Sequence, residues 1–208
     1  MAYNVHVISE GYSRMVSDSI MAANCTSTLL KGPNNIIVDT MTAWDKDVIV
    51  SGLKKHNMKC EDISYVICTH GHSDHIGNNN LFFNAKQHIV GFSINCRDHY
   101  SLHPFESGEV YKIDEDVSVL PTPGHTSEDV TVLVKTRDYG TVAVTGDLFE
   151  REEDLSEPSL WREVAGSQFP DKQETNRNKI LAVADYIVPG HGPMFKVSQE
   201  IKNRLKPD

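Results

Sequence analysis

The 208-residue sequence predicts a single α/β domain, spanning residues 1–208, in which two β-sheets form the core. Short apolar runs alternate with segments of helical pattern, as in mixed α/β folds. Histidine and aspartate recur where apolar runs stop. No repeat, linker or low-complexity segment divides the chain, and residues 194–208 are too few for a further domain.

The first half of the chain predicts four strands before residue 70. We expect strands at 5–10 and 21–31, separated by a polar loop at 12–18. The turn at 32–35 then predicts a hairpin into a strand at 36–38. A helical pattern over 44–56 places Val48, Ile49 and Leu53 on one face, which is typical of core packing. A strand at 65–68, a short helix over 76–83 and a short strand at 87–91 follow.

The second half begins with an irregular region, because the periodicity fails between residues 92 and 112. An apolar strand is expected at 117–120, and a hairpin from 130–134 and 141–144 around the turn at 138–140. Residues 150–157 are acidic and irregular, and 159–166 predict a short helix. The clearest helix covers 171–184, with Asp171 as N-cap, Glu174 three residues later and Pro170 before it; a strand at 187–188 follows.

Composition excludes several classes of protein. A net charge of −9 argues against broad, non-specific binding to a polyanion. No apolar run approaches the roughly 18 residues of a membrane helix, and residues 1–6 lack a signal core, so we expect a cytoplasmic protein without a membrane partner. Four scattered cysteines without a CxxC pair indicate neither a zinc ribbon nor a disulfide framework.

A cluster of metal-ligating residue types directly follows the strand predicted at 65–68. It consists of His70, His72, Asp74 and His75. Imidazole and carboxylate suit a divalent metal such as zinc. His70 and His72 alternate along an extended segment and can point the same way, whereas the adjacent Asp74 and His75 diverge. That divergence suits two neighbouring metals better than one. A histidine-rich surface loop is the alternative, but it would lack the preceding apolar strand.

Three later strand ends add further candidates. His125 follows a stiff turn with two prolines, Asp147 follows buried valines and needs a partner for its charge, and His191 lies between two glycines. Each junction alone is weak evidence, but together with the first cluster they predict one metal site. His99 and His103 lie in the irregular region and are left outside it.

This pattern resembles the metallo-β-lactamase superfamily of αββα sandwich hydrolases, through Thr69-His-Gly-His-Ser-Asp-His75, His125, Asp147 and His191. The resemblance covers essentially the whole chain and implies a four-layer αββα sandwich. It implies one metal on His70, His72 and His125, a second on Asp74, His75 and His191, and Asp147 as the bridge between them. The implied cofactors are two divalent ions, zinc first, with iron or manganese as alternatives.

Two such ions, roughly 3.5–4 Å apart, would share and activate a water, and the resulting metal-bridging hydroxide would attack the substrate. Asp74 is the expected catalytic residue, because it can orient the nucleophile or accept its proton. Thr69 and Thr126 are expected to hydrogen-bond behind the ligands, although either can be simply a turn residue.

The superfamily includes β-lactamases, glyoxalase II-type thioesterases, lactonases, flavodiiron proteins and nucleases, and its fold does not choose among them. Residues 69–78, 146–151 and 183–193 most closely resemble an animal subgroup assigned as endoribonucleases of histone pre-mRNA 3′ ends, in cytosol and nucleus. We therefore expect a metal-dependent endoribonuclease. A glyoxalase II-like hydrolase of small thioesters or esters is the alternative, and a non-catalytic metal-binding protein a third.

Candidate RNA contacts follow the bridging aspartate along the chain. They are Arg151, Trp161, Arg162 and Lys172, for which the alternative is an amphipathic surface segment with a packed Trp. The expected partners are RNA or a small-molecule substrate, and assembly as a homodimer is compatible with the sequence. The resemblance implies a location in the cytoplasm and also in the nucleus.

Overall fold

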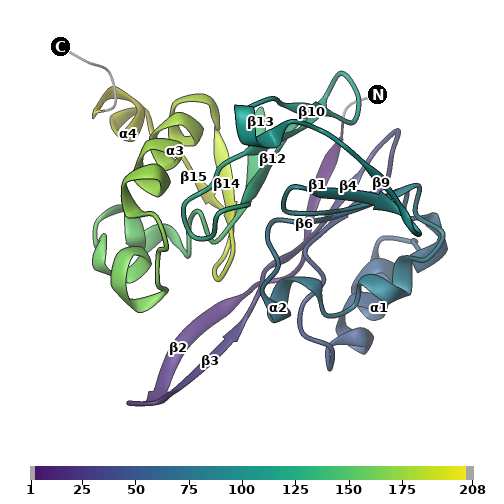
Figure 1. The fold of residues 1–208 in the computed structure, drawn as a ribbon, viewed down its shortest axis with the longest axis horizontal. Helices are drawn as coiled ribbons and strands as arrows, with labels where there is room; N and C mark the ends of the chain where they lie inside the picture. The colour runs from purple at the N-terminus through teal and green to yellow at the C-terminus, as the bar shows by residue number, and fades with distance from the viewer. Residues whose placement is uncertain (1–2, 205–208) are drawn as a thin grey trace.

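Two β-sheets face each other across a central core, and helices cover their outer sides (Figure 1). The computed structural model describes residues 3–204. The larger sheet has the order β1-β4-β5-β6-β7-β8-β9, in which β5, β6 and β7 run parallel. Its strands are β1 (Asn4–Ser9), β4 (Ser27–Lys31), β5 (Ile36–Val38), β6 (Tyr65–Cys68), β7 (Gln87–Val90), β8 (Ser93–Cys96) and β9 (His99–Ser101).

The smaller sheet has the order β10-β11-β12-β13-β14-β15. Its strands are β10 (Tyr111–Lys112), β11 (Val117–Pro121), β12 (Val130–Lys135), β13 (Thr141–Gly146), β14 (Tyr186–Pro189) and β15 (Phe195–Lys196). The hairpin predicted from 130–134 and 141–144 is confirmed as the antiparallel pair β12–β13. β13 and β14 run parallel, so their C-terminal ends lie at one edge of the sheet.

Four α-helices and five short helical turns accompany the strands within residues 3–204. The helices are α1 (Lys46–Lys55), α2 (Ser73–Ile76), α3 (Pro170–Val183) and α4 (Gln199–Arg204). The turns are η1 (Cys60–Asp62), η2 (Asn79–Phe82), η3 (Phe105–Ser107), η4 (Glu152–Leu155) and η5 (Leu160–Val164). Between residues 3 and 204, no helix is long and apolar enough to cross a lipid bilayer.

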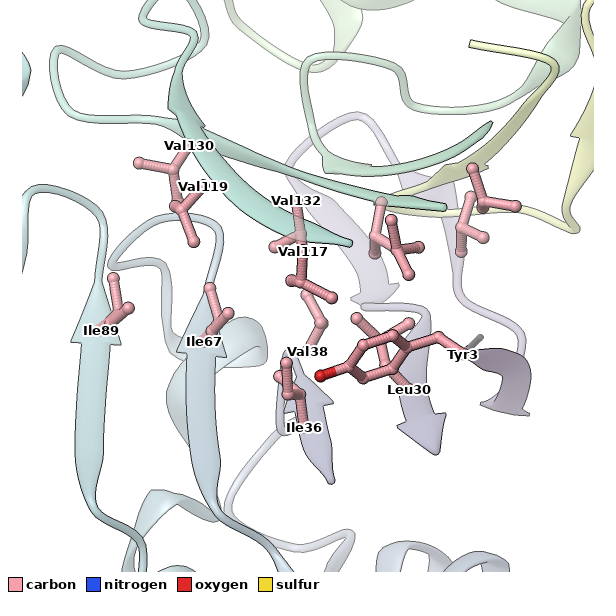
Figure 2. Close-up of a cluster of buried hydrophobic side chains, with 14 of the residues drawn as sticks. Tyr3, Leu30, Ile36, Val38, Ile67, Ile89, Val117, Val119, Val130 and Val132 are labelled. Atoms are coloured by element: carbon pink, nitrogen blue, oxygen red, sulfur yellow. The ribbon is translucent and has the colours of Figure 1, made fainter. Parts of the chain in front are cut away.

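The central core forms where the two sheets turn valine and isoleucine side chains toward each other. Figure 2 shows Val119 and Val132 of the smaller sheet facing Val38 and Ile67 of the larger one. Successive strand residues point to opposite faces, so Ile37 lies on the other face of β5. Both faces of these strands are buried, which explains why their sequences are continuously apolar.

The outer face of each sheet is covered by a helix. Ile49 and Leu53 of α1 pack on the larger sheet. Ile180 and Leu181 of α3 pack on the smaller one. The layers are therefore helix, sheet, sheet and helix, and the predicted αββα sandwich is confirmed.

The prediction was wrong at residues 12–31. The expected polar loop is strand β2 (Tyr12–Ser17), and the single strand expected at 21–31 is two strands, β3 (Ile20–Asn24) and β4. β2 and β3 form a separate antiparallel hairpin that projects from the two sheets (Figure 1). Met15 is 51% and Val16 61% exposed, so the hairpin lacks the alternation that burial of one face imposes on a strand.

Three smaller expectations need correction. The region 92–112 contains the short strands β8, β9 and β10 instead of being wholly irregular. The helix expected over 76–83 is divided into α2 and η2. The last long helix begins at Pro170 with Phe169 as N-cap, so Asp171 lies in its first turn instead of capping it. An acidic residue there still interacts favourably with the helix dipole.

Truncating a side chain between the sheets tests this packing. Ile36 is fully buried in the central core, and we expect Ile36→Ala to lower the free energy of unfolding by about 2–5 kcal/mol. Ile20→Ala is the matched control, because Ile20 is 58% exposed. Urea unfolding measures the free energy of unfolding of both variants. Equal losses in the two would contradict the assignment of Ile36 to the central core.

Candidate metal centre

Strand ends from both sheets carry the predicted ligands to one place. The segment after β6 holds His70, His72, Asp74 and His75, the loop after β11 holds His125, and Asp147 and His191 follow β13 and β14. Gly146 lies opposite Pro189 in the parallel pair, which brings Asp147 and His191 together. The N–H of Val130 donates to the carbonyl of Thr69 at 2.8 Å, so a backbone hydrogen bond joins the two sheets beside the cluster.

The first group of ligands comprises three histidines and one oxygen of Asp147. The Nδ1 of His72 lies 2.8 Å from the Nε2 of His70 and 3.1 Å from the Nε2 of His125. The Oδ2 of Asp147 lies 3.3 Å from the His125 Nε2 and 3.6 Å from the His70 Nε2. Three ring nitrogens and a carboxylate oxygen thus converge on one point, the donor set that zinc prefers.

The second group of ligands also contacts the carboxylate of Asp147. The Oδ1 of Asp147 is 3.3 Å from the Nε2 of His75 and 3.3 Å from the Nε2 of His191. The Oδ2 of Asp74 is 3.9 Å from the His75 Nε2 and 3.8 Å from the His191 Nε2. The His191 Nε2 also lies 3.3 Å from the Oδ2 of Asp147, so it contacts both oxygens. The Asp147 carboxylate is therefore shared between the two ligand groups.

Two buried polar atoms of the cluster make no hydrogen bond within residues 3–204, which indicates that the two ligand groups can hold cations. The Nε2 of His75 and the Oδ1 of Asp147 are buried and have no hydrogen-bond partner in the described part of the chain. Unpaired polar atoms in the interior cost free energy, which a coordinated metal would remove. His72 is exposed and Asp74 half-buried, so the cluster opens to solvent on their side.

The electrostatics of the two groups differ. Burial, with the charge of His75, holds the pKa of His70 well below its usual value. Burial alone would lower the pKa of His191, but the charge of Asp147 outweighs it and raises that pKa to about 9. Burial would raise the pKa of Asp147, yet the charges of His191 and His75 hold it well below its usual range. The second group retains a proton that a bound cation would displace.

Asp39, which the sequence reasoning did not select, lies directly behind the second group. Its carboxylate accepts the backbone N–H of Thr69 at 2.7 Å and lies 3.0 Å from the Nδ1 of His75. Thr69 also places its hydroxyl 3.2 Å from the Nδ1 of His70. A carboxylate on Nδ1 orients the imidazole so that Nε2 faces the metal. The available signal was a charged residue straight after the buried strand β5, the argument that selected Asp147.

His191 and its surroundings are fixed by backbone atoms. Its Nδ1 lies 2.9 Å from the carbonyl oxygen of Asn24 and 3.2 Å from that of Tyr12, at the base of the β2–β3 hairpin. A Cβ on Gly190 would lie 2.0 Å from the Oδ1 of Asp147, so this turn requires glycine. The hairpin and the turn together hold the His191 ring.

The His125 loop is held by Asp129, a second residue that the sequence reasoning missed. Its carboxylate accepts the backbone N–H groups of Gly124 and Thr126 and the Thr126 hydroxyl, at 3.0, 2.6 and 2.6 Å. Thr126 therefore supports the loop through Asp129. Burial raises the pKa of Asp129 to about 7.

Each candidate RNA contact has a partner within the protein. Trp161 is 2% exposed and lies under the guanidinium groups of Arg162 and Arg177, so the packed-Trp alternative describes it and it cannot stack on a base. Arg162 pairs with Glu174 at 2.6 Å. Lys172 lies over the ring of Phe169, 5.1 Å from its centroid, and Arg151 donates to the carbonyl of Ser13 at 3.1 Å.

Glu150 is a third residue that the sequence reasoning missed. It is 3% exposed and belongs to a group with Asp147 and His191 in which one ligand atom of each lies within 4.8 Å of the others. Burial and the charge of Asp147 raise the pKa of Glu150 to about 8. The acidic composition of segment 150–157 predicts a solvated loop, so this inward-facing residue was not selected from the sequence.

Comparison with known proteins gives a consistent family. Residues 21–91 match the model of the metallo-beta-lactamase superfamily. Metallo-beta-lactamase domain-containing protein 1 of Xenopus laevis is 41% identical, over 97% of this chain and 88% of that protein. The Homo sapiens protein of that name is 39% identical, over 82% of this chain and 62% of its own length. An N-acyl homoserine lactonase from Bacillus sp is 32% identical over 50% of this chain and 45% of the lactonase.

Solved structures share the fold at low sequence identity. A Thermotoga maritima protein of metallo-beta-lactamase type has a TM-score of 0.70 at 22% identity, over 94% of this chain and 100% of its own. The dizinc quorum-quenching lactonase AidC, with its product bound, has a TM-score of 0.62 at 17% identity, over 84% of this chain and 74% of its own. The αββα sandwich described above is thus the fold of these proteins.

Removing the charge behind His75 tests how the second group is held. We expect Asp39→Asn to weaken metal binding by about 10–100-fold, because the neutral amide cannot fix and polarise the His75 ring. Competition with a chromophoric chelator would measure the affinity. Asp62→Asn is the matched control, since that carboxylate accepts a backbone N–H at the surface. Equal affinities in the two variants would contradict the role given to Asp39.

Proposed function

This chain belongs to the metallo-β-lactamase superfamily of metal-dependent hydrolases, and we propose that it is an endoribonuclease that hydrolyses RNA phosphodiester bonds. One observation supports the hydrolytic chemistry above all others. The two oxygens of Asp147 lie 3.3 Å from ring nitrogens of two different histidine groups, with His125 on one side and His75 on the other. This is the arrangement expected of a carboxylate that bridges two cations.

The residues would hold two divalent ions, for which zinc is our first choice and iron or manganese the alternatives. His70, His72 and His125 would hold one ion, Asp74, His75 and His191 the other, and Asp147 both. When bound, such a pair supplies Lewis acidity and a water of lowered pKa. A dinuclear centre suits phosphodiester hydrolysis, since both the attacking and the leaving oxygen need stabilisation.

The side chains of the protein supply orientation and proton transfer. Asp74 is the catalytic candidate, because its carboxylate is 18% exposed and lies where the cluster opens to solvent. From there it can orient a water and accept its proton. Asp39 and the carbonyl of Asn24 hold the rings of His75 and His191 from behind. These contacts keep the ring nitrogens directed at the cluster, so little reorganisation precedes the reaction.

Access to the cluster is compatible with a polymer. His72 is exposed, and a side chain built on Gly71 would meet no atom within 4 Å. The assignment of RNA also draws on similarity over nearly the whole chain to the metallo-beta-lactamase domain-containing proteins. The resemblance of residues 69–78 and 146–151 to the animal endoribonuclease subgroup also supports RNA as the substrate. With that substrate we propose a role in RNA processing in the cytoplasm and nucleus.

A second candidate is hydrolysis of a small thioester, ester or lactone. Two observations favour it. Arg162 and Trp161 are engaged within the protein, and the net charge is −9; both facts disfavour tight binding of a polyanion. The relatives also include a protein named N-acyl homoserine lactonase.

Parallel assays separate the two candidates. Metal-loaded protein is incubated with a short histone-type pre-mRNA 3′ end, with S-D-lactoylglutathione and with an N-acyl homoserine lactone. We expect cleavage of the RNA alone, abolished by a chelator and by Asp147→Ala, which removes the carboxylate shared by both groups. Asp98→Ala is the control that keeps activity, because Asp98 is 87% exposed and outside the cluster.

The other outcomes decide against RNA. Hydrolysis of the thioester or the lactone with intact RNA would replace the endoribonuclease by the second candidate. Failure to cleave any of the three substrates, with both metals bound, would contradict both. Comparison of Asp147→Ala with Asp98→Ala by circular dichroism verifies that lost activity does not reflect lost fold.

A further inference from the structure

Glu150 is a buried acid beside the metal cluster, in addition to the seven ligands that the superfamily pattern supplies. One of its oxygens lies within 4.8 Å of a carboxylate oxygen of Asp147 and a ring nitrogen of His191. Its Oε1 is buried without a hydrogen-bond partner among residues 3–204. Its Oε2 accepts a long hydrogen bond of 3.3 Å from the Ser13 hydroxyl. One oxygen is therefore free to bind a cation.

The backbone holds Glu150 in this position. Its N–H donates to the Oδ2 of Asp154 at 2.8 Å, and its carbonyl accepts the N–H of His191 at 2.8 Å. Asp154 is in turn paired with the buried Arg177 at 2.7 Å. These contacts fix the backbone of Glu150 beside His191, and its side chain is buried there, so the cost of that burial must be met locally.

The neighbouring arginines do not neutralise Glu150. The Arg177 guanidinium is bound to both oxygens of Asp154 and to the carbonyl of Leu148. Arg151 directs its Nη1 to the carbonyl of Ser13. A buried carboxylate is costly unless a proton or a cation pairs with it, and the ligand cluster is where a cation is expected.

Glu150 also changes the donor balance of the two ligand groups. The first group has three imidazoles and Asp147, whereas the second already has two carboxylates, Asp74 and Asp147. Glu150 lies with Asp147 and His191, both of which contact the second group, so it would add a carboxylate oxygen on that side. Carboxylate oxygens suit manganese, which accepts more ligands than the four of a typical zinc site.

We propose that Glu150 is an eighth ligand, bound to the cation of the second group, and that its carboxylate allows this position to hold Mn²⁺. The first group, rich in imidazole, keeps its preference for zinc. The proposal rests on the dinuclear centre of the proposed function, but not on RNA as the substrate. The two metal positions would therefore differ in the metal that they accept.

Titration of metal-stripped protein with MnCl₂ and with ZnCl₂ tests the proposal. We compare wild type, Glu150→Gln and Ser13→Ala by calorimetry, with Mn²⁺ electron paramagnetic resonance as a second readout. Glu150→Gln should weaken one Mn²⁺ site by at least about tenfold and leave one Zn²⁺ site unchanged. Ser13→Ala removes the hydroxyl contact but keeps the carboxylate, so it should bind Mn²⁺ as wild type does.

Two outcomes would overturn the proposal. One is equal Mn²⁺ binding by Glu150→Gln and wild type. The other is an equal loss in Ser13→Ala and Glu150→Gln, because the contact with the β2–β3 hairpin would then be responsible. These measurements use no substrate, so failure of RNA cleavage would leave them unaffected, and their failure would leave the hydrolase assignment standing.

Crystals of wild-type protein soaked in MnCl₂ serve if Glu150→Gln does not fold. Anomalous scattering at the manganese edge should locate an ion with the Glu150 carboxylate among its ligands. An ion on Asp74, His75 and His191, with Glu150 still bound to Ser13 alone, would contradict the proposal.

Discussion

The buried carboxylate of Asp147 is the constraint on which the rest of the site depends. Its Oδ2 lies near His70 and His125 and its Oδ1 near His75, while the Nε2 of His191 lies 3.3 Å from both oxygens. Such a group is stable in the interior only when positive charge lies on both sides. The two-sheet architecture meets this requirement, because the ligands arrive from strand ends of opposite sheets and the core between the sheets fixes their separation.

Much of the fold, and the seven residues that the structure gathers into one cluster, could be predicted from the sequence. Continuous runs such as 36–38 and 65–68 report burial on both faces, which two sheets beneath covering helices produce. A charged or imidazole side chain directly after such a buried run needs a partner, and a metal would supply it. Asp147 and His70 were selected in this way, and the structure brings both into one cluster.

The missed features share physical reasons. The β2–β3 hairpin is exposed on both faces, so burial imposes no period on its sequence. Asp39 follows a strand of only three residues and acts through His75. Glu150 begins an acidic segment whose composition suggests solvent, although a contact with Asp154 turns it inward. Trp161 was expected to contact RNA but packs under Arg177. An aromatic residue in a charged segment carries no pattern that predicts its burial.

The number of metal ions per chain tests the central claim most directly. Protein loaded with zinc, freed of excess metal by gel filtration and measured by elemental analysis gives this number without a substrate. A centre in which Asp147 joins two ligand groups predicts two ions per chain, and one ion after Asp147→Ala or fewer. A wild-type protein that saturates at one ion, or binds none, would contradict the account.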